Sequence, residues 1–261
     1  MYRGSTKEHS DPLMRTYLED LIYRLSETSE VRDRRFEFII LEDESINAFA
    51  APGGIIGINL GMFLNTKREG ELASVMCHEL AHLSQRHYAR SQNRSSPLPN
   101  ALMILGSIAV AAASRNPEAI VIAPAAMQQM SINYTRSNEK EADRIGFNNL
   151  VKAGFDPNDM TMMFQRMQDK YQREDSEQFS YLMTHPLPSE RLTDMRIRAD
   201  NVSKQSEGKF RDNLDFYFMK ILQDIAKQFF RWPAAHEQMN KYYFGLLNFV
   251  QNLSLIHISE P

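Results

Sequence analysis

Hydrophobic residues near the start of the chain recur with a helical period. Asp11-Pro12 has the form of an N-cap followed by proline at the first helical position. The apolar residues that follow are spaced by four positions and predict an amphipathic helix: Leu13, Tyr17, Leu21 and Leu25.

Short apolar runs come next and predict a small sheet. Residues 36–40, 46–50 and 55–60 are rich in β-branched or other apolar side chains, as strands are. Pro52-Gly53-Gly54 predicts a turn between the second and third of these strands. We therefore expect the first sixty residues to form a helix followed by a small β-sheet.

Beyond residue 69 the pattern is helical. One long helix is expected from Glu69 until the Ser95–Pro99 stretch interrupts it. Residues 139–152 predict a further helix that stops at Gly154, a favourable residue after a helix end. Two more helices are expected from Asp156-Pro157 and from Pro188-Ser189. The fold class is therefore α+β, mainly helical with a small sheet.

Two strongly apolar runs, 101–113 and 119–130, lie between these helices. Each is shorter than the roughly 20 residues that cross a bilayer, so no transmembrane span is expected. The runs predict either a buried helical hairpin or a movable flap near a site, with peripheral contact to a membrane.

Composition limits the class of protein. Of 261 residues, 43% are hydrophobic and 24% are charged, which excludes a mostly disordered chain. The formal net charge of −3 gives no basic excess, so no nucleic-acid partner is expected. Cys77 is the only cysteine, which excludes an internal disulfide framework. The polar first ten residues lack a signal-peptide core, so the protein is cytoplasmic or the chain begins after its signal.

The strongest chemical signal is an HExxH motif, formed by His78, Glu79 and His82. Positions i and i+4 share one face of a helix, so the two imidazoles can hold one zinc ion. Glu79 can then serve as the general base that activates a water at the metal. A catalytic zinc site normally has a third protein ligand.

Glu139 is the candidate third ligand, in the segment Asn138–Gly146. Glu139 and Asp143 share a face of the predicted helix, so Asp143 can accept the second ring N–H of a ligating histidine. The small residues Ala142 and Gly146 would let this helix approach the HExxH helix closely. We expect Cys77 to be a core residue.

These residues carry a family resemblance. An HExxH motif followed by a distant E-x-x-A-D helix resembles the gluzincin metallopeptidases that include the HtpX heat-shock protease and the C-a-a-X prenyl protease, peptidase family 48 of the metallo class. Asn47–Ala50 with Pro52-Gly53-Gly54, and Thr184-His185-Pro186 with Arg191, are similar to two further segments of that family. From about Asp11 to Ala199 the chain resembles the soluble branch, of the BepA type.

The resemblance implies roles for these segments. It implies that the strand with Asn47, Ala48, Phe49 and Ala50 pairs with an extended substrate backbone. His185 is implied to lie near the metal, where it either stabilises the oxyanion or occupies the fourth zinc position and holds the enzyme off. Arg191 is implied to pair with Glu139 or Asp143, or to face the oxyanion.

The resemblance also bears on domains and location. A metallopeptidase domain is expected over 11–205 and a helical segment over 209–252. Residues 242–247 have the texture of a tetratricopeptide repeat start, although two packing helices of the same domain explain the segment equally well. The last nine residues, 253–261, resemble a translated sequencing adapter and would not be natural sequence. The soluble branch implies a periplasmic protein.

These observations together predict a zinc-dependent endopeptidase that holds one zinc ion per chain. The resemblance implies that its substrates are extended or misfolded polypeptides, in envelope quality control or outer-membrane protein assembly, with the assembly machinery as a partner. The alternative is a latent, self-inhibited zinc protein that acts mainly as a chaperone or binding module. A helical interaction module with an accidental HExxH is a further alternative, and it predicts no stoichiometric zinc.

Overall fold

The computed structural model describes residues 8–9, 11–94, 118–173 and 180–203, together with 210, 213, 216–217 and 219–221. The chain divides into two compact units, Met1–Tyr217 and Phe218–Pro261. In the second unit only residues 219–221 are described, and they are helical. The apolar run 101–113, most of the segment 209–252 and the tail 253–261 lie outside the described residues.

Three short strands form one sheet, as predicted. They are β1 (Glu37–Leu41), β2 (Ala48–Ala51) and β3 (Ile55–Asn59), in the order β1-β3-β2. β3 runs antiparallel to β2 and parallel to β1. The turn between β2 and β3 places both of its glycines in the left-handed region, where residues without a Cβ are favoured. Because β3 is the middle strand of this order, β2 lies at one edge of the sheet.

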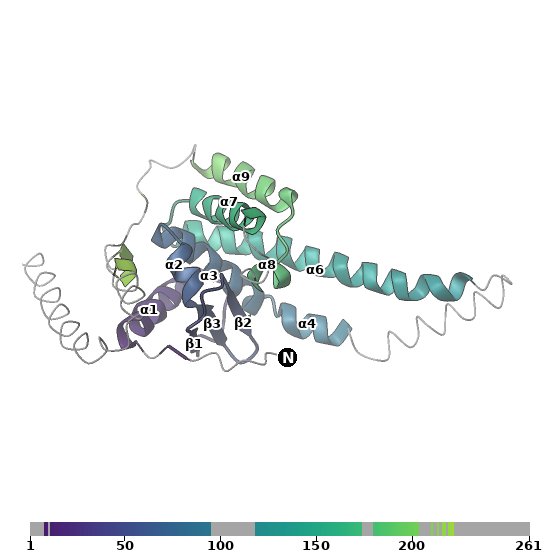
Figure 1. Ribbon diagram of the computed structural model, residues 1–261, viewed down its shortest axis with the longest axis horizontal. Coiled ribbons are helices and arrows are strands. Elements are labelled where there is room, and N and C mark those ends of the chain that lie inside the picture. The colour runs from purple at the N-terminus through teal and green to yellow at the C-terminus, as the bar shows by residue number, and fades with distance from the viewer. Residues whose placement is uncertain are drawn as a thin grey trace, which may run out of the picture. The chain divides into compact units, whose positions relative to one another are not determined.

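Helices make up most of the described chain, so the mainly helical α+β class is confirmed (Figure 1). The first helix begins after Asp11, whose side chain accepts a hydrogen bond from Leu13 N at 2.9 Å, as an N-cap does. The helices are α1 (Pro12–Thr28), α2 (Leu60–Asn65), α3 (Glu69–Ser84), α4 (His87–Arg94), α6 (Glu118–Lys152), α7 (Asn158–Arg173), α8 (Ser180–Thr184) and α9 (Ser189–Ser203).

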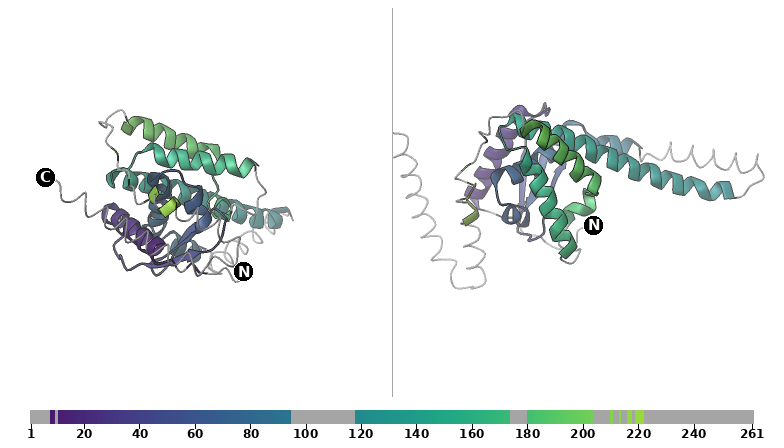
Figure 2. Two further views of the ribbon diagram at one scale, coloured as in Figure 1. Left: turned by 60° about the vertical axis from the view of Figure 1, so that its left-hand side comes forward. Right: turned by 90° about the horizontal axis from the view of Figure 1, so that it is seen from above.

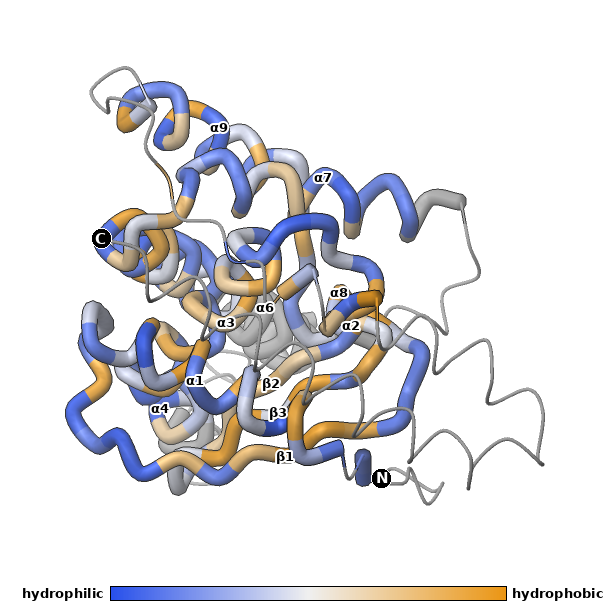
Figure 3. The backbone as a smooth tube through the Cα atoms, turned by 90° about the vertical axis from the view of Figure 1, so that its left-hand side faces the viewer, coloured by the Kyte–Doolittle hydropathy of each residue, from blue (hydrophilic) through white to orange (hydrophobic). Residues whose placement is uncertain are grey.

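Helix α3 is the centre of the first unit. It packs against α1, α6, α7 and strand β2 (Figure 2). Because neighbours surround it, every residue from Glu69 to Ala81 is buried, polar ones included. Orange, apolar stretches dominate the strands in Figure 3, whereas the outer helices α7 and α9 alternate between blue and orange. The HExxH motif is thus carried by the most enclosed helix of this unit.

Two helix boundaries differ from the sequence prediction. The helix expected from Glu69 to residue 94 ends at Ser84, and α4 begins again at His87. Between them Arg86 has φ 53°, a left-handed conformation that ends the helix without a glycine or proline. This break has no sequence signature, because nothing in Gln85-Arg86 disfavours a continuous helix.

The second correction concerns α6. The sequence predicted separate helices over 119–130 and 139–152, but α6 runs without interruption from Glu118 to Lys152. The intervening residues 131–138 contain neither glycine nor proline, and their serine, threonine and asparagine residues each cost at most about 0.7 kcal/mol of helix propensity. The short helices α2 and α8 were not predicted, and Leu60 begins α2 rather than ending a strand.

None of the helices in the described ranges combines the length and apolar character needed to cross a bilayer. The prediction of a flap or hairpin over 101–130 stays untested, because the first run and the side chains of the second are not described.

Candidate metal centre

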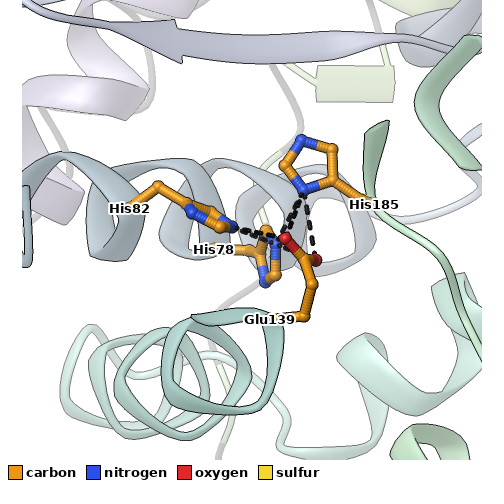
Figure 4. Close-up of side chains that lie close together, drawn as sticks. All are labelled: His78, His82, Glu139 and His185. Atoms are coloured by element: carbon orange, nitrogen blue, oxygen red, sulfur yellow. Dashed lines mark hydrogen bonds and ion pairs between the residues drawn. The ribbon is translucent and has the colours of Figure 1, made fainter. Parts of the chain in front are cut away.

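The two histidines of the HExxH motif lie one turn apart on α3 and point the same way. Their Nε2 atoms are 2.9 Å apart. Figure 4 shows both rings turned toward the same point. The side chain of His78 is fully buried, and that of His82 is 14% exposed. The predicted pairing of positions i and i+4 is therefore present.

Glu139 reaches this point from α6. Its two carboxylate oxygens lie 3.3 Å from His78 Nε2 and 3.2 Å from His82 Nε2. The close approach of the helices depends on Gly146, because a Cβ there would lie 3.0 Å from the backbone of Cys77 and His78. Ala142 and Cys77 are both fully buried, as expected.

His185 completes the cluster. It follows α8 directly, and its Nδ1 lies 3.1 Å from Glu139 Oε1 and 3.4 Å from His78 Nε2 (Figure 4). Its side chain is 11% exposed. Four side chains from three separate parts of the chain thus present one donor atom each, and these atoms all lie within 4.8 Å of one another.

The donor set fits a small metal ion. Bonds of about 2.0–2.1 Å in a tetrahedral site put neighbouring ligand atoms roughly 3.3 Å apart. The separations among His78, His82 and Glu139, and those of His185 from His78 and Glu139, run from 2.9 Å to 3.4 Å. Three imidazoles and one carboxylate are also ligands that transition metals accept. The cluster can therefore hold a metal ion at its centre.

Two further charged side chains, Asp143 and Arg191, lie behind the four candidate ligands. Asp143 Oδ1 lies 3.0 Å from Nδ1 of His78, on the side away from the metal position. Arg191 binds both oxygens of Asp143 at 2.6 and 2.7 Å and lies 2.9 Å from Glu139 Oε2. Arg191 is thus placed behind the two carboxylates, both of which were candidate partners from the sequence.

Two buried carboxylates set the charge state of the histidine cluster. Burial alone would lower the pKa of His78, but the carboxylates of Asp143 and Glu139 outweigh it and raise that pKa to about 10. Burial would raise the pKa of Glu139, but His185, His78 and His82 hold it well below its usual range. The carboxylates therefore stabilise a positive charge at His78, whereas burial lowers the pKa of His82.

Two residues of the site were missed by the sequence analysis. Tyr181, one helical turn before His185, stacks on its ring with centroids 4.5 Å apart. Burial raises the pKa of Tyr181 well above its usual value, so the phenol keeps its proton. His87 lies against the far side of His82, and burial lowers its pKa to about 4. The four-residue spacing between Tyr181 and His185 could have indicated Tyr181. No sequence signal, in contrast, marks the helix break that places His87.

An open groove of about 2120 Å³ passes over the cluster. Glu79, which is almost fully buried, lines it, and its Oε1 lies 3.6 Å from Nε2 of His185. Three of the four predicted substrate-binding residues, Asn47, Phe49 and Ala50, also line the groove. Ala48 is fully buried behind them. The edge strand β2 and the metal position thus share one groove.

Comparison with known proteins agrees with this geometry. The model of peptidase family M48 matches residues 12–199. A putative beta-barrel assembly-enhancing protease of Vibrio cholerae is 45% identical over 76% of this chain and 42% of its own length. The beta-barrel assembly-enhancing protease of Escherichia coli is 38% identical over 84% of this chain and 45% of its own length. The mitochondrial metalloendopeptidase OMA1 of Schizosaccharomyces pombe is 26% identical over 73% of this chain and 56% of its own length.

This chain spans less than half the length of the two bacterial relatives. The family match, in contrast, covers most of this chain and includes all four residues of the candidate metal site. The chain belongs to peptidase family M48.

Proposed function

We propose that the protein is a zinc-dependent endopeptidase. The observation that supports this most directly is the convergence of His78, His82 and Glu139, the last two of which line a groove together with Glu79. Three protein ligands leave one coordination position for a water or a substrate, as in catalytic zinc sites. Imidazole and carboxylate donors suit zinc, which supports that metal over the harder cations that prefer oxygen alone.

The residues of the chain have separate tasks in this proposal. A bound zinc ion would supply a Lewis acid that polarises water and the scissile carbonyl. Glu79 takes the proton of the attacking water and delivers it to the leaving amine. Asp143 fixes the orientation of His78, and Arg191 holds Asp143 and Glu139 in place.

The edge of β2 supports an extended polypeptide as substrate. One side of β2 pairs with β3, and residues of β2 line the same groove as His82 and Glu139. A substrate strand that pairs with β2 would be held by backbone hydrogen bonds, which read main chain rather than side-chain identity. Asn47, Phe49 and Ala50 would then contact its side chains, and folded proteins would be excluded.

The names of the bacterial relatives support a cellular setting. They are called beta-barrel assembly-enhancing proteases, so we propose extended or misfolded outer-membrane proteins as substrates and the assembly machinery as a partner. A periplasmic location follows from that setting.

Glu79→Gln tests the activity. This change keeps the size of the side chain but removes the base, so one zinc should be retained while cleavage of casein falls by about 100-fold or more. Zinc content by elemental analysis and casein cleavage are measured on the same samples. Glu19→Gln, a change on the surface of α1, serves as the matched control and should leave both unchanged. Cleavage that survives in Glu79→Gln would overturn the proposal.

His185 favours a second candidate function. Its Nδ1 lies 3.1 Å from Glu139 Oε1 and 3.4 Å from His78 Nε2, so it can act as a fourth ligand and fill the position that water needs. Closed four-ligand zinc sites are structural rather than catalytic. The protein in this state would be a latent peptidase that binds polypeptides without cleaving them.

A further inference from the structure

His82 is held on its outer side by another histidine. Its Nδ1 lies 2.8 Å from Nδ1 of His87, while its Nε2 faces the metal position. His87 Nε2 lies 2.9 Å from Glu141 Oε2, and Arg90 donates to the same oxygen at 2.6 Å. The four side chains form one continuous line from the metal position to the surface.

The backbone brings His87 to this place. In an unbroken helix a residue five positions further on lies about 140° around the axis, away from the same face. The break at Gln85-Arg86 removes this rotation, because Arg86 takes the left-handed conformation with φ 53°. That conformation is sterically unfavourable for a residue other than glycine, so the surrounding contacts must stabilise it. His87 is 4% exposed, whereas its neighbours Arg86 and Tyr88 are exposed.

The proton positions along this line follow from the chemistry. When Nε2 of His82 binds a metal, its Nδ1 carries the hydrogen and must donate it. Nδ1 of His87 then accepts this bond, which leaves its Nε2–H to donate to Glu141. Each nitrogen has one role, so the tautomers of both rings are fixed. Asp143 faces Nδ1 of His78 in the same way, and both metal-binding imidazoles are therefore backed by a partner.

We propose that His87 is a positioning residue for the metal site, which orients His82 and fixes its tautomer, with Glu141 holding His87 in turn. This inference rests on the proposed zinc site. Partners of this kind are typically worth 10- to 100-fold in metal affinity. A neutral histidine suits this position, because one ring nitrogen can accept the hydrogen bond from His82 while the other donates to Glu141.

Three variants and one binding measurement test the inference. His87→Leu keeps bulk but removes the acceptor, His87→Asn keeps an acceptor near the Nδ1 position, and Glu141→Ala removes the outer bond. The dissociation constant for zinc is measured by competition with a fluorescent chelator. We expect it to rise 10- to 100-fold in His87→Leu, with a smaller rise in Glu141→Ala and substantial recovery in His87→Asn.

The melting temperature of each metal-free protein separates positioning from folding. A merely structural role would lower this temperature in His87→Leu and His87→Asn alike, without the recovery of zinc affinity in the asparagine variant. If His87→Leu does not fold, Glu141→Ala carries the test, because the Glu141 side chain is 37% exposed. If the dissociation constants of the variants for zinc stay within twofold of that of the unmodified chain, this inference alone would be overturned. An unmodified chain that binds no zinc would overturn the proposed function as well.

Discussion

His185 reaches the cluster from a segment 107 positions further along the chain than His78. Its ring is held by stacking on Tyr181 and by the nearby carboxylate of Glu139. A histidine in this position can either occupy the fourth coordination site or move aside for substrate. In the proposed peptidase, activity would therefore depend on how firmly the His185 side chain is held.

Removing His185 should raise activity. His185→Ala opens the fourth coordination position, so we expect casein cleavage to increase several-fold while His78, His82 and Glu139 keep the zinc ion. Initial cleavage rates at saturating zinc measure this. His9→Ala is the matched control, because His9 lies against Glu42 on the β1 side of the sheet. Lost cleavage in His185→Ala with zinc retained would instead assign His185 a role in the reaction.

Much of the site at this scale was predictable, because the relevant chemistry is local. His78, Glu79 and His82 follow from spacing on one helix, and Asp143 is one turn from Glu139. The structure brings these residues together as expected. The placement of His185 and Arg191 near Glu139 came from a family resemblance, since no spacing rule connects residues so far apart. Their roles in the reaction stay predictions.

At the scale of elements, the contact between α3 and α6 sets the geometry of the site. Two of the proposed ligands come from α3 and one from α6, so the distance between the helices determines whether the donor atoms converge. Gly146 permits this distance, because its Cα faces the backbone of Cys77 and His78. The requirement for a small residue there is therefore steric rather than conformational.

Gly146→Val should separate the two helices. The added side chain meets backbone atoms that cannot turn away, so we expect the free energy of unfolding to fall by about 1–3 kcal/mol. Urea unfolding of the metal-free protein measures this, and zinc affinity should fall with it. Asn148→Val places the same side chain on an exposed face of α6 and should change stability by only a few tenths of a kcal/mol. Equal effects of the two changes would contradict this steric account.

The elements that escaped prediction are those that tertiary contacts decide. Long amphipathic patterns predicted α1, α3 and α7, because each helix buries one or more faces with a helical period. The break at Arg86 depends on contacts of His87 with residues on α3 and α6, which local sequence does not encode. The parallel pairing of β1 with β3 likewise follows from long-range packing rather than from either strand alone.

At the scale of the whole first unit, the proposed zinc ion would join distant parts of the chain. Its three proposed ligands lie on α3 and α6, so binding would couple the positions of these two helices. A ligand that binds only the folded state stabilises it in proportion to its affinity and concentration. The metal would therefore contribute to the fold of Met1–Tyr217 as well as to its chemistry.

The central claim is that one zinc ion lies between His78, His82 and Glu139. Diffraction data collected on either side of the zinc absorption edge, from crystals of the zinc-loaded chain, test this directly. We expect one anomalous peak per chain, about 2.0–2.1 Å from Nε2 of both histidines and from a carboxylate oxygen of Glu139. A peak bound by other residues, or no peak in a properly folded chain supplied with zinc, would contradict the account.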